Sequence, residues 1–145
     1  TETVLDIQQS PHDAALWIAT TQAEGVLQSH DGGRSWHKIA ALPAGEAFYN
    51  VAFDARDSRR LAVASWTYGV HTSEDGGATS TARNAGLPAE HCAFRAGIDP
   101  DTGRLYASID RDALFVSDDF GRTWRNDGMP GSTIYSFVFT PRVAK

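Results

Sequence analysis

Short apolar runs recur along this chain at a regular interval, and polar residues that favour turns separate them. The runs alternate in polarity or are wholly apolar, as is typical of strands with at least one buried face. Four of the runs are equivalent in register: residues 4–8, 49–53, 94–98 and 134–139. No stretch has the length and 3.6-residue periodicity of an amphipathic helix. The pattern predicts an all-β protein.

One octapeptide occurs three times, starting at Ser29, Ser73 and Ser117 with a constant spacing of 44 residues. The copies read Ser-His-Asp-Gly-Gly-Arg-Ser-Trp, Ser-Glu-Asp-Gly-Gly-Ala-Thr-Ser and Ser-Asp-Asp-Phe-Gly-Arg-Thr-Trp. All fit Ser-x-Asp-x-Gly-x-Ser/Thr-Trp, except that Ser80 replaces the tryptophan of the second copy. A fixed period of about 40–45 residues is typical of propeller blades with four strands each.

The remaining apolar segments fall into register with the octapeptides and complete three four-stranded units. Predicted second strands are 16–19, 61–64 and 105–109, third strands are 25–28, 69–72 and 113–116, and fourth strands are 36–39, 80–83 and 124–126. We therefore expect a single partial β-propeller domain over residues 1–145. Its blades span about 3–43, 47–88 and 92–130, and one extra inner strand follows at 133–140.

Three blades and one strand are too few for a closed ring, because propellers typically close with 4–8 blades. Two interpretations remain. The chain is a piece of a longer propeller, or two copies pair head to tail into a six-bladed ring. Since open strand edges favour association, we expect either self-association or the remaining blades of a longer propeller as partner.

The residue types of the octapeptide are those of a structural turn between the third and fourth strands of a blade. Its aspartate can accept hydrogen bonds from backbone N–H groups, its last glycine allows an unusual backbone conformation, and its tryptophan can bury a large ring. This structural role is assigned to Ser29, Asp31, Gly33, Trp36, Ser73, Asp75, Gly77, Ser117, Asp119, Gly121 and Trp124. The second copy keeps Asp and Gly but loses Trp, as a turn with a separable packing anchor would. We expect Ser80→Trp to stabilise the second blade.

The octapeptide resembles the Asp-box, or BNR repeat, of sialidase-like, sortilin-like and related propellers. The resemblance extends from Val4 to the last predicted strand. It implies that the boxes lie on the rim, away from the ligand face, and it favours a secreted or periplasmic bacterial protein. The family includes sialidases, xyloglucan hydrolases, sorting receptors and photosystem assembly factors. Fold-level analogy cannot choose among these activities.

Composition excludes several other classes of function. A formal net charge of −5 argues against binding nucleic acid, which requires a basic surface. No apolar run approaches the roughly 20 residues that span a membrane. Cys92 is the single cysteine and the five histidines lack metal-ligand spacing, so we expect no internal disulfide, no metal site and no cofactor.

The predicted ligand face combines the loops between second and third strands with the blade junctions. Trp66 and Tyr68 lie in one such loop, where they either stack on a ligand or contribute one ring to the core. Arg95 lies on an inner strand, whose alternation directs it toward the channel. The candidate ligand-binding residues are Trp66, Tyr68, Arg95, His91, Tyr49, Glu24, Asp110 and Arg111.

Catalytic residues are not assigned by the sequence. Sialidases use three arginines on inner strands, and only Arg95 occupies such a position. A glycosidase needs two suitably spaced carboxylates, and nothing fixes the separation of the available ones, which are Glu24, Glu46, Glu90, Asp110 and Asp112. We therefore favour a non-catalytic binding or scaffold module for a glycan or protein ligand. The alternative is a segment of a BNR-repeat glycoside hydrolase, sialidase-like or xyloglucanase-like, whose catalytic carboxylates lie partly on missing blades.

Overall fold

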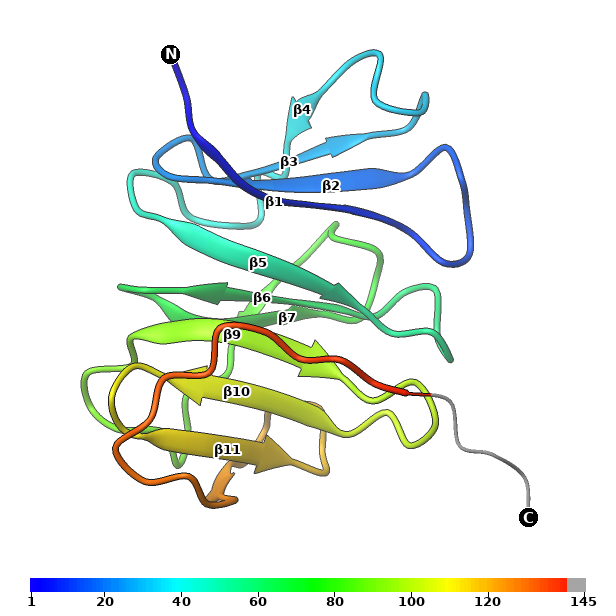
Figure 1. The fold of residues 1–145 in the computed structure, drawn as a ribbon. Coiled ribbons are helices and arrows are strands. Elements are labelled where there is room, and N and C mark those ends of the chain that lie inside the picture. The colour runs from blue at the N-terminus through cyan, green and yellow to red at the C-terminus, as the bar shows by residue number, and fades with distance from the viewer. Residues whose placement is uncertain (141–145) are drawn as a thin grey trace.

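Three four-stranded antiparallel sheets make up the computed structural model, which describes residues 1–140 (Figure 1). We call the sheets blades 1, 2 and 3. Blade 1 contains β1 (Val4–Gln9), β2 (Trp17–Thr21), β3 (Val26–Ser29) and β4 (His37–Lys38). Blade 2 contains β5 (Phe48–Phe53), β6 (Leu61–Ser65), β7 (Gly69–Ser73) and β8 (Thr81–Ala82). Blade 3 contains β9 (Ala93–Ile98), β10 (Leu105–Ile109), β11 (Ala113–Ser117) and β12 (Arg125–Asn126). The strands are ordered by sequence in every blade, and no helix occurs in residues 1–140, which confirms the predicted fold class.

Each blade is an up-and-down meander whose second strand is buried on both faces. In blade 2, β6 is buried at every residue and pairs with β7 from Leu61 opposite Ser73 to Ser65 opposite Gly69. Gly69 has a φ of 73°, and a Cβ there would lie 2.3 Å from Oδ1 of Asn84. Glycine therefore meets both a backbone and a packing requirement at the start of β7.

Two apolar cores lie between consecutive blades. The core between blades 1 and 2 includes Ile18, Val26, Phe48 and Val51, and the core between blades 2 and 3 includes residues of β6, β9 and β10. The first strands β1, β5 and β9 lie side by side along one edge of the three blades (Figure 1). Blade-to-blade packing thus covers the sheet faces that a single meander leaves exposed.

The fourth strand of each blade is shorter than the sequence predicts. β4 contributes two register pairs with β3, Leu27 with Lys38 and Gln28 with His37. After Lys38 the chain leaves the edge of blade 1, and the next side chain, Ile39, is buried in the core between blades 1 and 2. The same two-residue length recurs at β8 and β12.

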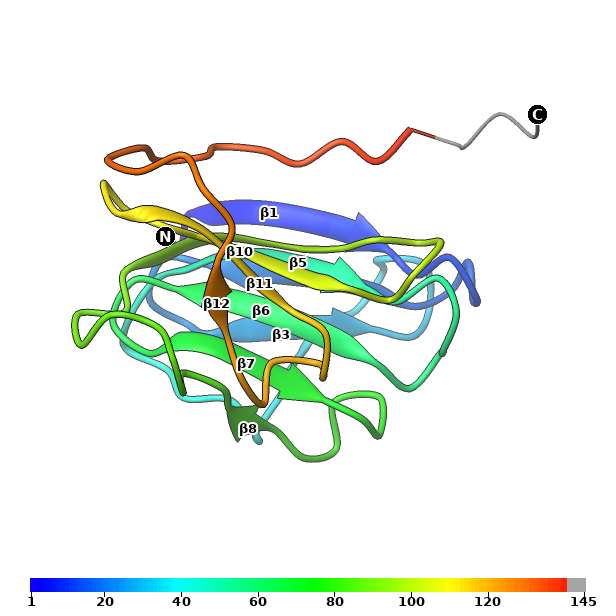
Figure 2. The same cartoon turned by 90° about the horizontal axis from the view of Figure 1, so that it is seen from below.

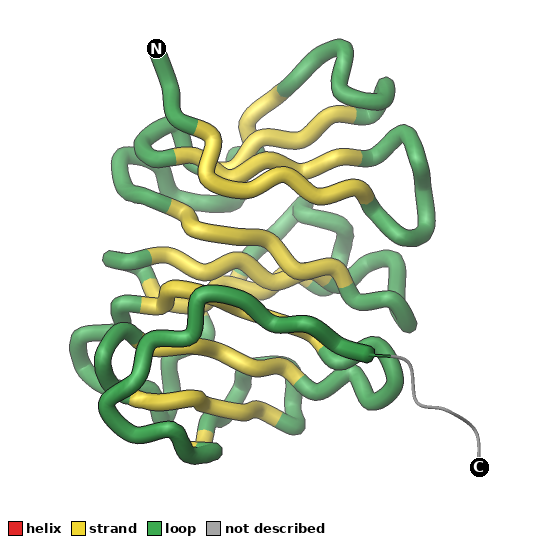
Figure 3. The backbone as a smooth tube through the Cα atoms, in the orientation of Figure 1, coloured by secondary structure: helices red, strands yellow, loops and turns green. Residues whose placement is uncertain are grey.

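The segment 133–140, expected as an extra inner strand, is extended but belongs to no ladder. It runs beside β9 and is drawn as loop (Figures 2 and 3). Side chains hold it: Nε of Arg95 donates to O of Tyr135 at 2.6 Å, and N of Ile134 donates to Oγ of Ser108 at 2.7 Å. A first strand pairs with the second strand of its own blade, and the described chain offers no such partner to this segment.

Candidate ligand-binding site

The three octapeptide turns, residues 29–36, 73–80 and 117–124, have the same hydrogen-bond pattern. In the third turn, Oγ of Ser117 donates to Oδ1 of Asp119 at 2.7 Å and accepts from N of Gly121 at 2.7 Å. Thr123 donates to the two carboxylate oxygens of Asp119, from N at 2.8 Å and from Oγ1 at 2.7 Å. The first two turns repeat these bonds around Asp31 and Asp75. Each aspartate therefore accepts at least three hydrogen bonds from its own turn.

This pattern has an electrostatic consequence for each aspartate. Hydrogen bonds to an ionised carboxylate favour its charged form. The bonds from Thr123 and Ser117 lower the pKa of Asp119 from 3.8 to about 2. Bonds from Ser35 and Ser29 lower the pKa of Asp31, and bonds from Thr79 and Ser73 lower that of Asp75. All three side chains are therefore ionised at neutral pH and bonded to donors of their own turns.

The tryptophan position of the octapeptide links blade 3 to blade 2 and blade 2 to blade 1. Nε1 of Trp124 donates to O of Arg83 in blade 2 at 2.7 Å, and the ring is only 7% exposed. Ser80 makes a smaller link of the same kind, from Oγ to O of Ala41 at 2.5 Å. Trp36, in blade 1, bonds to O of Gly33 in its own turn and is half-buried. The packing anchor is therefore completed by a neighbouring blade.

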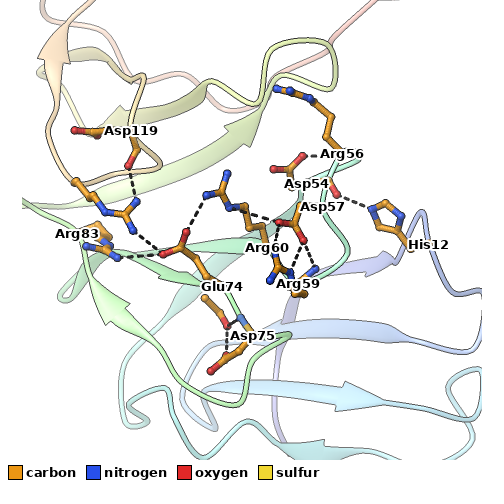
Figure 4. A network of polar contacts seen from close by, with 12 residues as sticks. His12, Asp54, Arg56, Asp57, Arg59, Arg60, Glu74, Asp75, Arg83 and Asp119 are labelled. Atoms are coloured by element: carbon orange, nitrogen blue, oxygen red, sulfur yellow. Dashed lines mark hydrogen bonds and ion pairs between the residues drawn. The ribbon is translucent and has the colours of Figure 1, made fainter.

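Ionic contacts join blades 2 and 3 on the same side of the molecule (Figure 4). The carboxylate of Glu74 accepts from Nη2 of Arg60 at 2.9 Å and from Nη2 of Arg122 at 2.8 Å. Nη2 of Arg83 lies 3.7 Å from Oε2 of the same carboxylate. Arg60 and Glu74 belong to blade 2 and Arg122 to blade 3, so the cluster crosses the boundary between the blades.

Arg95 lies where the sequence places it, on inner strand β9, but it serves a structural contact. Nη1 of Arg95 lies 3.8 Å from Oδ2 of Asp6 on β1, and its Nε holds the carbonyl of Tyr135. A cavity of about 440 Å³ lies along these inner strands and is lined by Asp6, Asn50, Arg95 and Phe137 among others. Among residues 1–140, Arg95 is the only arginine that lines this cavity, so this part of the chain forms no three-arginine cluster of the sialidase type there.

A row of aromatic rings crosses the opposite end of the blades from the octapeptide turns. The ring of Trp66 contacts that of Tyr49 edge-on at 6.1 Å, and Tyr49 stacks on Phe94 at 4.7 Å. Phe94 in turn meets Tyr135 edge-on at 4.9 Å. Trp66 is 37% exposed and lies directly after β6, at the strand end away from the turn of blade 2. The row presents aromatic surface to solvent at both of its ends, since Tyr135 is exposed as well.

Two shallow hollows flank Trp66. One has a volume of about 370 Å³ and is lined by Trp66, Pro88, Glu90, Cys92, Ile109, Asp110, Arg111 and Asp112. The other, of about 390 Å³, is lined by Trp66, Thr67, Ala89, Glu90, His91 and Cys92. An exposed indole therefore stands between hollows whose walls carry carboxylates and an arginine. This combination of an apolar ring with a few polar groups is typical of ligand sites.

Five of the eight candidate ligand-binding residues meet at this corner: Trp66, Tyr49, His91, Asp110 and Arg111. Tyr68 points elsewhere. Its ring packs against Phe48 at 6.1 Å within the core between blades 1 and 2, and its hydroxyl donates to O of Ala44 at 3.3 Å. Of the two alternatives for this loop, Tyr68 takes the packing role and Trp66 the exposed one.

Glu24 lies apart from the corner, in the loop between β2 and β3, where it forms an ion pair with Lys38 of its own blade. The hydrogen bond from Lys38 lowers the pKa of Glu24. Asp110 accepts from Oγ1 of Thr133 at 2.6 Å and from Nε of Arg111 at 3.0 Å, and the bond from Thr133 lowers the pKa of Asp110. A general acid needs a raised pKa. Neither carboxylate is therefore prepared to donate a proton at neutral pH.

Phe94 and Tyr135 are the two rings of the aromatic row that are not among the candidate ligand-binding residues of the sequence analysis. Phe94 stacks between Tyr49 and Tyr135 and so joins the two ends of the row. A signal for both was available in the register, because Tyr49 and Phe94 begin the equivalent segments 49–53 and 94–98, and Tyr135 is the second residue of the segment 134–139. Burial and the negative charge of Asp110 raise the pKa of Tyr49, so the Tyr49 hydroxyl keeps its proton at neutral pH.

Within residues 1–140, no three or more His, Cys, Asp or Glu side chains are grouped so as to hold a metal ion. The same part of the chain contains no helix with the length and apolarity needed to cross a membrane.

No family model matches the sequence. A xyloglucanase from Paenibacillus sp. is 30% identical over 107 residues, which cover 70% of this chain and 10% of that enzyme. The chain therefore spans about a tenth of the length of this curated relative.

Solved structures show the fold class directly. A GH74 enzyme from Niastella koreensis superposes with a TM-score of 0.67 at 20% identity, over 83% of this chain and 20% of that one. YCF48 bound to a D1 peptide superposes with a TM-score of 0.71 at 16% identity, over 92% of this chain and 42% of that one. These neighbours are β-propeller proteins, so the three blades form part of a propeller.

Proposed function

We propose that the chain is a non-catalytic propeller module of the Asp-box class that binds a carbohydrate along the aromatic row at Trp66. The observation that carries this proposal is the exposed indole of Trp66 between two hollows lined by acidic side chains. The three octapeptide turns, which share one hydrogen-bond pattern, support the assignment to the Asp-box class.

Carbohydrate fits the chemistry of this corner. A sugar ring has an apolar face that packs on an exposed aromatic ring, and its rim of hydroxyls needs acceptors. Glu90 and Asp112 line the hollows beside Trp66, and within residues 1–140 neither carboxylate forms an ion pair. The indole would take the ring face while these carboxylates accept hydroxyl hydrogen bonds. The similarity to a xyloglucanase supports a β-glucan as the first ligand to test.

Titration calorimetry with xyloglucan oligosaccharides and cello-oligosaccharides tests the proposal. We expect saturable binding that Trp66→Ala weakens about tenfold, equivalent to ~1.4 kcal/mol. Tyr68→Phe is the matched control, because Tyr68 packs inward and should leave affinity unchanged. Absence of binding to every oligosaccharide, or equal binding by Trp66→Ala, would contradict the proposal. A peptide that binds at Trp66 while no sugar does would replace the glycan by a protein ligand.

A second candidate function is a segment of a glycoside hydrolase, favoured by the 30% identity to a xyloglucanase. Its chemistry would require an acid and a second carboxylate. Glu24 and Asp110 both have lowered pKa values, which favours the binding module. Hydrolysis of xyloglucan or of a fluorogenic glycoside that is lost in Glu24→Gln, Glu46→Gln or Asp110→Asn would establish the hydrolase instead.

A further inference from the structure

An ion pair between octapeptide turns marks the boundary of blades 2 and 3. Arg122 stands at the sixth position of the third turn, and its Nη2 donates to Oε2 of Glu74, at the second position of the second turn, at 2.8 Å. The same guanidinium donates through Nη1 to O of Asp119 at 3.0 Å. The backbone bond orients the arginine, and its other nitrogen reaches the preceding blade.

Blade 1 has one face that no other blade of the described chain covers, which we call its open face. Arg34 on this side is the equivalent of Arg122, but the described chain places no equivalent of Glu74 opposite it. Arg34 stands at the sixth position of the first turn, and its Nη1 donates to O of Asp31 at 3.4 Å, as Arg122 does to Asp119. Within residues 1–140, the Arg34 guanidinium has no carboxylate in ion-pair range. Arg34 is therefore oriented like Arg122 toward a preceding blade that the described chain does not supply.

The open face of blade 3 carries the acid half. Asp118 stands at the second position of the third turn. Among the described residues 1–140 it pairs only inside its own blade, with Arg104 at 2.6 Å and Arg125 at 2.9 Å. Its side chain remains 54% exposed. Glu74, its equivalent, has a comparable partner within its blade, Arg60, and gains the arginine of the next blade. Asp118 therefore lacks the partner that an arginine at the sixth position of a following turn would provide.

Burial of apolar side chains likewise depends on whether a preceding blade is present. Val51 and Ala96, fourth in β5 and β9, are 3% and 2% exposed because the preceding blade covers them. Ile7 occupies the equivalent position in β1 and is 47% exposed. Trp36 likewise bonds within its own turn, whereas Trp124 bonds to the preceding blade. The face of blade 1 is thus built like an internal blade face.

We propose that a second copy of this chain covers these faces, with blade 3 of one copy packed head to tail on blade 1 of the other and Asp118 paired with Arg34. The occupant of blade 1 must offer an acid at the second turn position, and blade 3 offers Asp118. The occupant of blade 3 must offer an arginine at the sixth position, and blade 1 offers Arg34. Two such contacts close a ring of six blades, within the usual range for propellers. This association is independent of the carbohydrate site.

The segment 133–140 competes for the same face of blade 3. Phe137 lies against Gly97, where an added Cβ would approach the ring to 2.8 Å, and Phe137 and Phe139 both contact Tyr106. The segment is held on blade 3 by ring contacts and by side-chain hydrogen bonds of Arg95 and Ser108, and β1 of the second copy would take its place. Removing the segment should therefore strengthen the association.

Light scattering after size exclusion, over a range of concentrations, tests the proposal on the 145-residue chain. We expect a mass about twice the 15.7 kDa of one chain. Arg34→Glu and Asp118→Arg should each shift the protein to monomer, and the double variant should restore the dimer by exchanging the charges. Arg59→Glu is the matched control, because Arg59 is exposed on blade 2 and pairs only with Asp57.

Truncation after Ser132 provides the second variant, with an expected severalfold tighter dimer. Far-UV circular dichroism checks that each variant keeps its sheet content. A monomer at every concentration for both the full and the truncated chain would overturn the proposal. So would a dimer that both charge reversals leave intact.

Discussion

The carboxamide of Asn50 bonds to both backbone polar groups of Ala96, 46 residues away in the next blade. Its Nδ2 donates to O of Ala96 at 2.8 Å, and its Oδ1 accepts from N of Ala96 at 2.9 Å. One blade earlier, Oδ2 of Asp6 accepts a hydrogen bond from N of Val51 at 3.2 Å. A polar residue at the third position of an inner strand thus bonds the blade to its successor, and Arg95 continues the series with Tyr135.

Asn50→Ala should destabilise the fold by roughly 1–3 kcal/mol, since it leaves the buried N–H and C=O of Ala96 without partners. Equilibrium urea unfolding measures the loss. Gln8→Ala, an exposed change on β1, is the control and should alter stability by less than about 0.5 kcal/mol. Equal effects of the two substitutions would show that the bonds to Ala96 contribute nothing.

Trp124→Ala should cost roughly 3–5 kcal/mol, because its ring is buried and its indole N–H bonds to blade 2. Trp36→Ala should cost less in the monomer, because that ring is half-buried against its own turn. Thermal melts of the two variants measured together give the comparison. Identical shifts would mean that contact with a preceding blade is not what makes the anchor effective. The expectation that Ser80→Trp stabilises blade 2 stays a prediction for the same assay.

The octapeptide aspartates should make stability fall in acid. The pKa of Asp119 is about 2 in the folded chain, against 3.8 for an aspartate without these hydrogen bonds, as in the unfolded chain. The unfolded state therefore takes up protons first as the pH falls. The stabilisation is complete above about pH 4 and is lost progressively toward pH 2. Melting temperatures across this range should show a steep decline that is shallower in Asp119→Asn. An unchanged slope in that variant would assign the acid sensitivity to other groups.

His71 should add a second pH dependence at a higher range. Burial lowers the pKa of His71 below 6.5, and its ring contacts Phe48 and Tyr68. Within residues 1–140, Nδ1 of His71 has no hydrogen-bond partner. Below about pH 6.5 the unfolded state binds the extra proton, so stability falls as the pH decreases through the folded pKa. His71→Phe should remove the slope that begins just below about pH 6.5, while Asp119→Asn leaves it. A slope that survives in His71→Phe would contradict the assignment.

Much of the fold could be predicted because it rests on local chemistry repeated in register. The octapeptide supplies its own acceptors and donors within a few residues, as the bonds from Ser117 and Thr123 to Asp119 illustrate. The constant spacing of 44 residues then placed the strands of three blades. The fourth strands and the segment 133–140 were the exceptions, because ladder length depends on which neighbours are present and not on apolar pattern.

The candidate site could be predicted only in part. The sequence selected Trp66 and Tyr68 as a pair, but one ring is exposed and the other packs on Phe48. The sequence does not distinguish Trp66 from Tyr68, since both are aromatic residues in one short loop. The difference lies in what the neighbouring segments bring: Phe48 lies under Tyr68, whereas Tyr49 and a hollow lie beside Trp66.

The sequence by itself therefore determined the turns, the repeat and the all-β class, because each depends on residues close together in the chain. Only the tertiary structure decided which tryptophan is buried and which aromatic rings form a row. It also decided that, within residues 1–140, neither Arg34 nor Asp118 forms an ion pair with a neighbouring blade. Those properties depend on contacts between blades, made by residues some 40 positions apart, such as Trp124 with Arg83 and Asn50 with Ala96.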